Sequence, residues 1–192
     1  MVNNYRFGLT FLFIWSVFLY SCRFSKVSES DDETISCEKL SFEFIKENFL
    51  NKNIDSLPIL DCLDIKDTII ENDEGVSWEG KIYLDSTNAA FLAETNWVNR
   101  KRISRITILN SLIKEGNLAV GKKLEDIRDM ISNKIPSAPD GYLFLEHYKD
   151  KDINIQMDIS DYSYDSPLYM GALSLDKMPN NLKIESIVIM DR

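Results

Sequence analysis

The chain has 192 residues, and its 31 Asp and Glu against 22 Lys and Arg give a net charge of −9 at pH 7. This balance argues against nucleic acid as a partner, because a phosphate backbone is bound by a basic surface. Aromatic residues make up 11% of the chain, and it holds only seven glycines and five prolines. That composition excludes a disordered stalk and indicates a folded domain.

An uncharged, apolar run occupies residues 7–20, preceded by Arg6 and followed by Cys22. About fourteen residues is the length of a secretory signal core and is short of the ~20 that a spanning helix needs. The run ends in the sequence LYSC, residues 19–22, which resembles the lipobox of bacterial lipoproteins. A plain secretory signal or an unprocessed helix with a coincidental cysteine is the other interpretation.

The lipobox resemblance implies that residues 1–21 are a signal peptide and that lipid is attached to Cys22 after cleavage. Several acyl chains hold a protein firmly to a bilayer. We therefore expect a protein anchored by lipid in the bacterial outer membrane, on its periplasmic or its cell-surface face. Loss of Arg6 with the signal peptide would leave a net charge of −10.

Residues 22–35 contain the stretch RFSKVSESDDET, which is polar and acidic and shows no apolar periodicity. We interpret this segment as a flexible tether between lipid and domain. Within it, the sequence SDDE at Ser30–Glu33 resembles the acidic export tag of surface lipoproteins from Bacteroidetes-type bacteria. The tag would place the domain at the cell surface, whereas a plain tether leaves its face undecided.

Residues 36–192 are expected to form an α+β domain with a predominantly antiparallel sheet and one or two packed helices. Once Cys22 is lipidated, Cys37 and Cys62 remain. Outside the cytoplasm they could close a disulfide worth about 3 kcal/mol by loop entropy, or both could be small buried side chains. Two cysteines and one histidine are too few for a convincing zinc site, so we expect no metal and no cofactor.

In the first half, apolar spacing predicts a helix over residues 37–50 with Ser36 as its cap. The spacing of Phe42, Ile45 and Phe49 favours a helix there over a strand. Strands are predicted further along the chain, with a hairpin loop at Asp85–Asn88. The four predicted strands cover residues 60–71, 77–84, 90–97 and 102–110.

In the second half, the clearest predicted helix covers residues 122–135. Leu124, Ile127 and Ile131 form its apolar stripe, and Pro136 ends it. Strict alternation over residues 153–160 is typical of a half-buried antiparallel strand. Two further strands are predicted at 142–148 and 182–190.

The two halves echo each other. The stripe Phe42, Ile45 and Phe49 aligns with the stripe of the second helix at an offset of 82, and the isoleucines of 103–108 align with those of 184–189 at 81. One interpretation is a tandem helix-plus-sheet duplication with halves 36–116 and 117–192. Coincident apolar periodicity is the other.

The second half opens with the sequence VGKKLEDI at Val120–Ile127, which resembles the opening of small lipoprotein domains of the SmpA/BamE kind. A tandem pair of such units is similar to the arrangement in β-lactamase-inhibitor proteins. Both relatives are binding proteins, so the resemblance implies binding and not catalysis, by analogy of fold alone.

The sequence shows no catalytic constellation. His147 is the only histidine, and in a predicted strand beside Glu146 we expect it to be structural or at the surface. Gly-rich phosphate loops and nucleophile elbows are absent. Residues 150–161 begin like a calcium loop but have Ile155 where a glycine is needed, so we interpret them as an ordinary loop.

Two stretches are candidate interaction surfaces. The first is Asp158–Met170 with Tyr162, Tyr164 and Tyr169, because exposed tyrosines make good interface anchors, unless they pack back on the sheet. The second is Trp97 with the basic residues Arg100 and Arg102, which would contact an acidic partner or simply form a charged hairpin tip.

We therefore predict a non-catalytic module that binds an unknown protein partner at the cell envelope. The alternative is an inhibitor or immunity protein against a secreted or periplasmic enzyme or toxin, whose association would be sensitive to salt. A third class, an enzyme that uses paired carboxylates such as a glycosidase, would need two acids in a cleft.

Overall fold

A computed structural model describes residues 35–132 and 142–190, all within one compact unit, Glu33–Arg192. The predicted signal peptide, Cys22 and residues 22–34 of the tether lie outside the described residues. Within the described part of the chain, no helix is long and apolar enough to cross a membrane.

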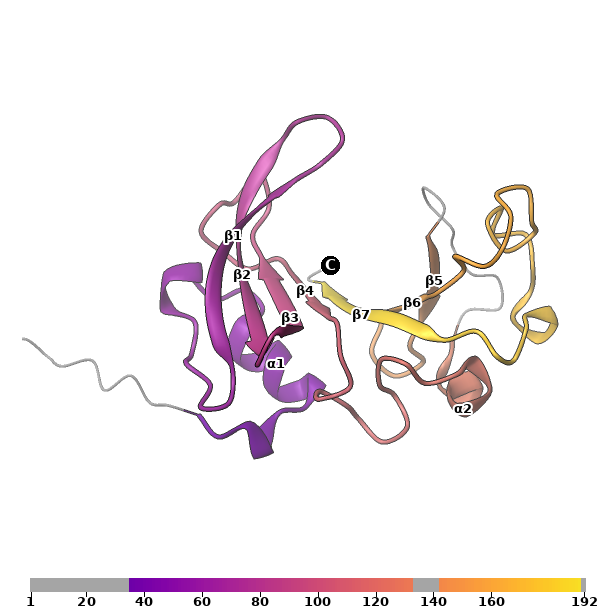
Figure 1. Cartoon of the computed structure of the whole chain (residues 1–192), viewed down its shortest axis with the longest axis horizontal. Coiled ribbons are helices and arrows are strands. Elements are labelled where there is room, and N and C mark those ends of the chain that lie inside the picture. Colours follow the sequence, from indigo (N-terminus) through magenta and orange to yellow (C-terminus); the bar gives the residue numbers. More distant parts are fainter. Residues whose placement is uncertain (1–34, 133–141, 191–192) are drawn as a thin grey trace, which may run out of the picture. The chain divides into compact units, whose positions relative to one another are not determined.

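The domain is organised around one seven-stranded sheet with the order β1-β2-β3-β4-β7-β6-β5 (Figure 1). All neighbouring strands are antiparallel. The expected class, α+β with a predominantly antiparallel sheet, is thereby confirmed, although the helices are few and short. The strands are β1 (Asp64–Glu71), β2 (Ser77–Asp85), β3 (Asn88–Glu94), β4 (Arg105–Ile108), β5 (Leu143–Glu146), β6 (Ile153–Met157) and β7 (Ile184–Met190).

The first helix, α1 (Phe42–Phe49), begins later than predicted. Its cap is Ser41, whose hydroxyl oxygen accepts from the backbone N–H of Phe44 at 3.1 Å. Ser36, the predicted cap, instead accepts from the N–H of Glu38 at 3.4 Å and begins the 3₁₀ turn η1 (Cys37–Lys39). Two serine caps follow one another, so the segment is broken into a short turn and a helix. Further 3₁₀ turns are η2 (Ile54–Ser56), η3 (Arg128–Met130) and η5 (Leu175–Lys177).

The predicted helix over residues 122–135 is wrong in its length. Only α2 (Leu124–Ile127) is α-helical, and η3 follows it directly. Ile131 then pairs with His147 in an isolated β-bridge, and the N–H of Ser132 donates to the carbonyl of Glu146 at 2.8 Å. Hydrogen bonds to the edge of β5 thus replace those that would have continued the helix, whose predicted last residues lie outside the described ones.

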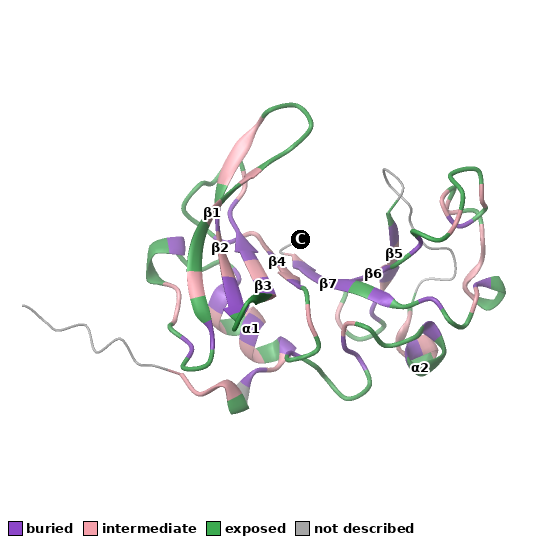
Figure 2. Ribbon diagram, viewed as in Figure 1, coloured by how far each residue is buried: buried purple, intermediate pink, exposed green. Residues whose placement is uncertain are grey.

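One face of the sheet carries the core. Phe49 of α1 packs edge-on against Tyr83 and Phe91, with ring centroids 5.4 and 5.2 Å away, and these two rings stack at 4.3 Å. Figure 2 shows the central strands largely buried, whereas β1 at the edge is half-buried and exposed. The predicted alternation of Ile153, Ile155 and Met157 is confirmed, since all three are buried.

The hairpin loop was predicted more closely than the ends of the strands were. The hairpin loop between β2 and β3 lies at Asp85–Asn88 as predicted, with Ser86 in the left-handed region at φ 57°. β3 ends at Glu94 and not at Trp97, and β4 covers only four of the predicted residues. The connection between β3 and β4 is therefore longer than expected, and it carries Trp97 and the basic residues.

Candidate functional site

The second face of the sheet bears apolar side chains that do not join the core. We call it the open face, because the buried residues of α1 and α2 all belong to the core cluster on the other face. Strand register places seven apolar residues here that are absent from that cluster, and all but the buried Val188 are half-buried. They are Ile70, Trp78, Ile82, Leu92, Phe144, Val188 and Met190. Apolar surface of this kind on a protein often marks a binding site.

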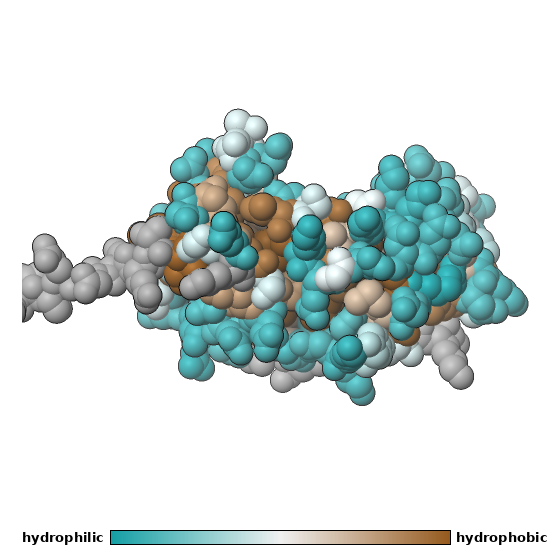
Figure 3. Space-filling model, turned by 90° about the horizontal axis from the view of Figure 1, so that it is seen from below, coloured by the Kyte–Doolittle hydropathy of each residue, from teal (hydrophilic) through white to brown (hydrophobic). Residues whose placement is uncertain are grey.

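Most of the surface drawn in Figure 3 is hydrophilic. On the side drawn in Figure 3, hydrophobic residues nevertheless come to the surface in a central area bordered by hydrophilic ones. Among the described residues, Val98 and Trp97 are among the most exposed large hydrophobic side chains, at 72% and 65%.

Gly80 lets the apolar side chains of the open face pack over β2. A Cβ atom on this residue would lie 2.5 Å from Cδ1 of Ile70 and 3.3 Å from Cδ1 of Leu92. Real Cβ atoms do not approach other atoms as closely as 2.5 Å. Glycine at this position therefore allows β1 and β3 to bring their isoleucine and leucine together across the strand between them.

An ion pair lies beside this apolar surface. Glu94 and Arg105 are register partners across β3 and β4, with 3.1 Å between Nε of Arg105 and Oε1 of Glu94. The indole N–H of Trp78 donates to the other carboxylate oxygen at 3.3 Å. Nε of Arg105 is buried without an aligned hydrogen bond, so we describe its contact with Glu94 as an ion pair.

The Glu94 carboxylate is held out of water. Its side chain is 6% exposed, against 43% for Arg105. Burial raises the pKa of Glu94, while the charge of Arg105 and the hydrogen bond from Trp78 act in the opposite direction. The buried carboxylate therefore fixes the positions of the Trp78 and Arg105 side chains.

These residues line a hollow of about 300 Å³ together with Trp97 and Met190. We call it the Trp97 hollow. The hollow combines two tryptophans, a buried acid and an arginine on one side of the sheet. Thr95, Asn96 and Ser104 complete its lining.

Trp97 stands on an ordered turn. The hydroxyl and the N–H of Thr95 both donate to the carbonyl of Glu79, at 2.9 and 3.0 Å. The side-chain oxygen of Asn96 then accepts from the N–H groups of Val98 and Asn99, at 3.0 and 2.6 Å, which is an Asx turn. The exposed indole is thus presented by a fixed backbone, which lowers the entropy lost on binding.

Two of the three basic residues of the same connection face solvent. Arg100 and Arg102 are exposed and lie outside the lining of the Trp97 hollow. Lys101 between them forms an ion pair with Asp55 at 3.2 Å. The backbone here runs along residues 51–54, through hydrogen bonds such as that from the N–H of Ile54 to the carbonyl of Lys101 at 3.0 Å. The two arginines are therefore free to meet a partner next to Trp97.

The tyrosine surface predicted at Asp158–Met170 is divided by the structure. Tyr162 and Tyr169 are half-buried and pack against the core. Only Tyr164 is exposed, at 85%, and its ring centroid lies 4.9 Å from that of Tyr169. No tyrosine lines the Trp97 hollow. The stretch that composition predicted as the first interaction surface thus offers one exposed tyrosine side chain.

The structure joins Cys37 to Cys62 in a disulfide with 6.0 Å between the Cα atoms. These two residues and Asp61 form a cluster of possible metal ligands. Both sulfurs are used by the disulfide, and a carboxylate oxygen of Asp61 accepts from the N–H of Cys37 at 3.0 Å. This donor set does not fit a metal ion, since thiolates bind metals and a disulfide does not.

His147 is a buried structural residue. It is 4% exposed, and its Nδ1 accepts from the N–H of Asp150 at 3.2 Å. The loop that resembled a calcium site holds a lysine: Nζ of Lys46 lies 2.8 Å from Asp150 and 2.7 Å from Asp152. The ammonium group of Lys46, a residue of α1, thus pairs with the two aspartates that a calcium ion would bind, and it links the helix to this loop.

The sequence did not predict a functional role for Trp78, Glu94 or Arg105. Each points away from the core, in a strand that was predicted from its inward-facing apolar residues. The three side chains come together only when β2, β3 and β4 are in register. A signal was present in the alternation, because Trp78 and Ile82 are apolar at positions where a solvent-facing strand side would be polar.

No family model matches the chain, and no curated protein matches it in sequence. A solved structure is similar in fold, that of the uncharacterised protein yfeY from Escherichia coli, at a TM-score of 0.52 and 16% identity. The match covers 80% of this chain and 99% of that chain. At this identity the likeness shows the fold alone.

Proposed function

We propose that the chain is a membrane-anchored envelope lipoprotein that binds a protein partner through Trp97 and the open face of the sheet, without catalysing a reaction. The observation that carries this proposal is the exposed indole of Trp97 beside Arg105 and the apolar open face. Tryptophan and arginine contribute most of the binding energy at many protein interfaces. Trp97 and Arg105 are here placed by ordered backbone and by a buried acid.

Binding is favoured over chemistry by how the Trp97 hollow uses its acid. Glu94 accepts from Trp78 and faces Arg105, so its carboxylate is engaged in positioning them. Glycosidic catalysis would require a second carboxylate facing the first across the hollow. Among the described residues that line this hollow, Glu94 is the single acid.

A location in the cell envelope is supported by two independent features. The LYSC sequence resembles a lipobox, with Cys22 as the lipidated residue. The disulfide between Cys37 and Cys62 is of a kind that forms in oxidising compartments and is rare in the cytosol. The lipobox resemblance favours an outer-membrane lipoprotein, and the disulfide independently favours an oxidising compartment such as the periplasm or the cell surface.

A tandem duplication of a helix and three strands accounts for the topology. The units would be α1-β2-β3-β4 and α2-β5-β6-β7, with β1 added to the first. β4 and β7 pair antiparallel at the centre, with Thr107 opposite Val188, and these two residues also correspond at the repeat offset of 81. A local two-fold axis through this pair would relate the units. The starts of α1 and α2, Phe42 and Leu124, are 82 residues apart.

An inhibitor or immunity protein is the second candidate, favoured by the net charge of −10 without the signal peptide and by the similarity of a tandem arrangement to β-lactamase-inhibitor proteins. Its target would be a basic enzyme or toxin, and its association rate would fall steeply with salt. Binding through apolar surface and Trp97 would depend on salt much less, which separates the two.

The binding proposal is tested by photo-crosslinking in intact cells. A photoreactive amino acid replaces Val98, which is 72% exposed and adjacent to Trp97. We expect a discrete crosslinked product that disappears when Trp97→Ala is added. A matched probe at Leu112, which is exposed elsewhere, controls for collisions. The same product from both positions, or a product that persists without the indole, would contradict the proposal.

Anchoring is tested separately by membrane fractionation of the full chain and of Cys22→Ala. The wild type is expected in the membrane fraction and the variant in the soluble fraction. Protease treatment of intact cells then distinguishes the surface from the periplasm. If Cys22→Ala stays in the membrane, the lipoprotein proposal fails while the binding proposal stands on its own test.

A further inference from the structure

The two edges of the sheet differ. At one edge, β5 is followed outward by residues 130–132, where the N–H of Ser132 donates to Glu146 and the N–H of Tyr148 donates to the carbonyl of Met130, both at 2.8 Å. At the other edge, β1 pairs with β2 on its inner side. No described residue forms a backbone hydrogen bond to the outer side of β1. An eight-residue strand with an open edge is a template for a further strand.

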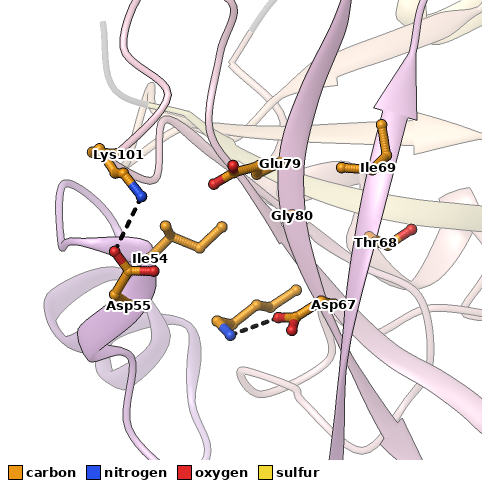
Figure 4. A pocket seen from close by; sticks show the side chains of 9 residues that line it. Ile54, Asp55, Asp67, Thr68, Ile69, Glu79, Gly80 and Lys101 are labelled. Atoms are coloured by element: carbon orange, nitrogen blue, oxygen red, sulfur yellow. Dashed lines mark hydrogen bonds and ion pairs between the residues drawn. The ribbon is translucent and has the colours of Figure 1, made fainter.

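A hollow of about 640 Å³ lies beside β1 on the core side of the sheet, between β1 and β2 and the turn at Ile54 and Asp55. Figure 4 shows the side chains of Glu79, Ile54 and Lys101 directed into this space. α1 does not cover this part of the sheet, since Ile69 here is 66% exposed. We call it the β1 hollow.

One of the three acidic side chains that line the β1 hollow has no cationic partner among the described residues. Lys81 forms an ion pair with Asp67 at 2.7 Å, and Lys101 forms one with Asp55 at 3.2 Å. Glu79 is exposed and forms no ion pair or side-chain hydrogen bond with a described residue. The hollow therefore has two compensated pairs and one free carboxylate.

Strand register places this carboxylate next to the open edge. Ile69 of β1 is the partner of Glu79 on β2, and both lie on the face of the β1 hollow, because Asp67 and its partner Lys81 do as well. A residue of a strand added outside β1, at the level of Ile69, would point to the same face. A lysine or arginine there has the length to reach toward Glu79, and its aliphatic stem would cover Ile69.

We infer that the outer edge of β1 accepts an extended segment of a partner protein as an added strand, with a basic side chain that is directed to Glu79 and packs its aliphatic stem against Ile69. This is recognition by β-strand addition, in which backbone hydrogen bonds give affinity and side-chain pockets give specificity. The inference rests on the proposed protein-binding function but uses a surface separate from the Trp97 hollow.

A second copy of the chain is the less suitable occupant. It would carry the same excess of acid, at a net charge of −10 without the signal peptide, and would bring its own Glu79 without a cation for either. Pairing of two β1 strands about Asp67 would also place this aspartate opposite its own copy, and like charges directly opposite each other destabilise a sheet. A basic, extended segment avoids both conflicts.

The test uses the full chain in detergent and two synthetic ten-residue peptides, one alternating Val and Lys and one alternating Val and Glu. We expect saturable binding of the Val-Lys peptide with slower hydrogen exchange of the β1 amides, and no such protection by the Val-Glu peptide. Glu79→Gln should weaken binding about three- to fivefold, as expected for a partly exposed charge pair. Ile69→Lys should weaken it further, because it places a cation on the edge.

Asp85→Asn is the matched control, since it removes one exposed negative charge outside the β1 hollow. Equal weakening by Asp85→Asn and Glu79→Gln would mean general attraction to an acidic protein and would overturn the inference, as would an absence of protection in β1. These outcomes leave the proposed function intact if crosslinking at position 98 still depends on Trp97. Loss of that dependence, with β1 protection retained, would instead reject the Trp97 surface alone.

Discussion

The ion pair between Glu94 and Arg105 closes the base of the connection that presents Trp97. Glu94 is the last residue of β3, and Arg105 is the first of β4. The N–H of Ser104 also donates to the carbonyl of Glu94 at 2.9 Å. The turn that carries Trp97 therefore starts and ends at a buried acid and its cation, so the positions of the indole and of the basic residues depend on this pair.

Arg105→Met is expected to destabilise the domain by about 1–3 kcal/mol, because it leaves the buried Glu94 carboxylate without its cation. The double variant Glu94→Gln/Arg105→Met should recover most of this loss, since no buried charge then remains. Urea unfolding of the wild type, both single variants and the double variant gives the coupling free energy. Additive single effects would mean that the pair does not act as a unit.

The sequence predicted most of the sheet, because inward alternation is a local property. Ile153, Ile155 and Met157 show it without interruption, and the hairpin at Asp85–Asn88 is marked by its composition. The start of α1 was misplaced because Ser36 and Ser41 are both good caps, and the sequence does not say which one begins the α-helix.

The candidate site could not be predicted from the sequence, because its residues come from different strands. Glu94 and Arg105 meet across a ten-residue connection whose length was underestimated, and Trp78 joins them from a third strand. The predicted helix over 122–135 failed for a related reason, because Ile131 and Ser132 find non-local partners on β5. Helical periodicity was present there, but tertiary pairing decided the backbone.

His147 should make stability depend on pH on the acid side of neutrality. Burial lowers the pKa of His147 below its ordinary value of 6.5, against the opposing attraction of Glu115 and Asp150 and with a small like-charge effect of Lys149. The unfolded chain therefore binds a proton at a higher pH than the folded one, so the free energy of unfolding should decrease as the pH falls below 6.5, down to the folded pKa.

His147→Asn removes this titration and keeps a side-chain oxygen to accept from the N–H of Asp150. Urea midpoints measured between pH ~7 and ~5 should fall for the wild type and stay flatter for the variant. Asp150, which is paired with Lys46, is common to both chains, but the charge of His147 acts on its pKa, so the difference between the two curves reports His147 together with this neighbour. Parallel curves for the two proteins would assign the acid sensitivity to other groups.

The disulfide fixes the start of the domain to the segment that leads into β1. Beside it, the N–H of Ile35 donates to Ile59 and the N–H of Asp61 donates to Ile35, at 2.9 and 3.0 Å. Replacing Cys37 and Cys62 together by serine should cost about 2–4 kcal/mol. A reducing agent should shift the urea midpoint of the wild type to that of the double variant and leave the variant unchanged. A wild type whose urea midpoint already equals that of the double variant before reduction would show that the bond is not formed in the protein.

Tyr164→Ala distinguishes the tyrosine stretch from the Trp97 surface. Tyr164 is 85% exposed, so its loss should leave the melting temperature unchanged, whereas Tyr169→Ala would also remove packing against the core and is not a clean test. We expect the crosslinked product at position 98 to persist in Tyr164→Ala and to disappear in Trp97→Ala, with both variants folded by circular dichroism. If the product instead disappears only in Tyr164→Ala, the partner is bound by the exposed tyrosine of the Asp158–Met170 stretch, and the apolar open face has another role.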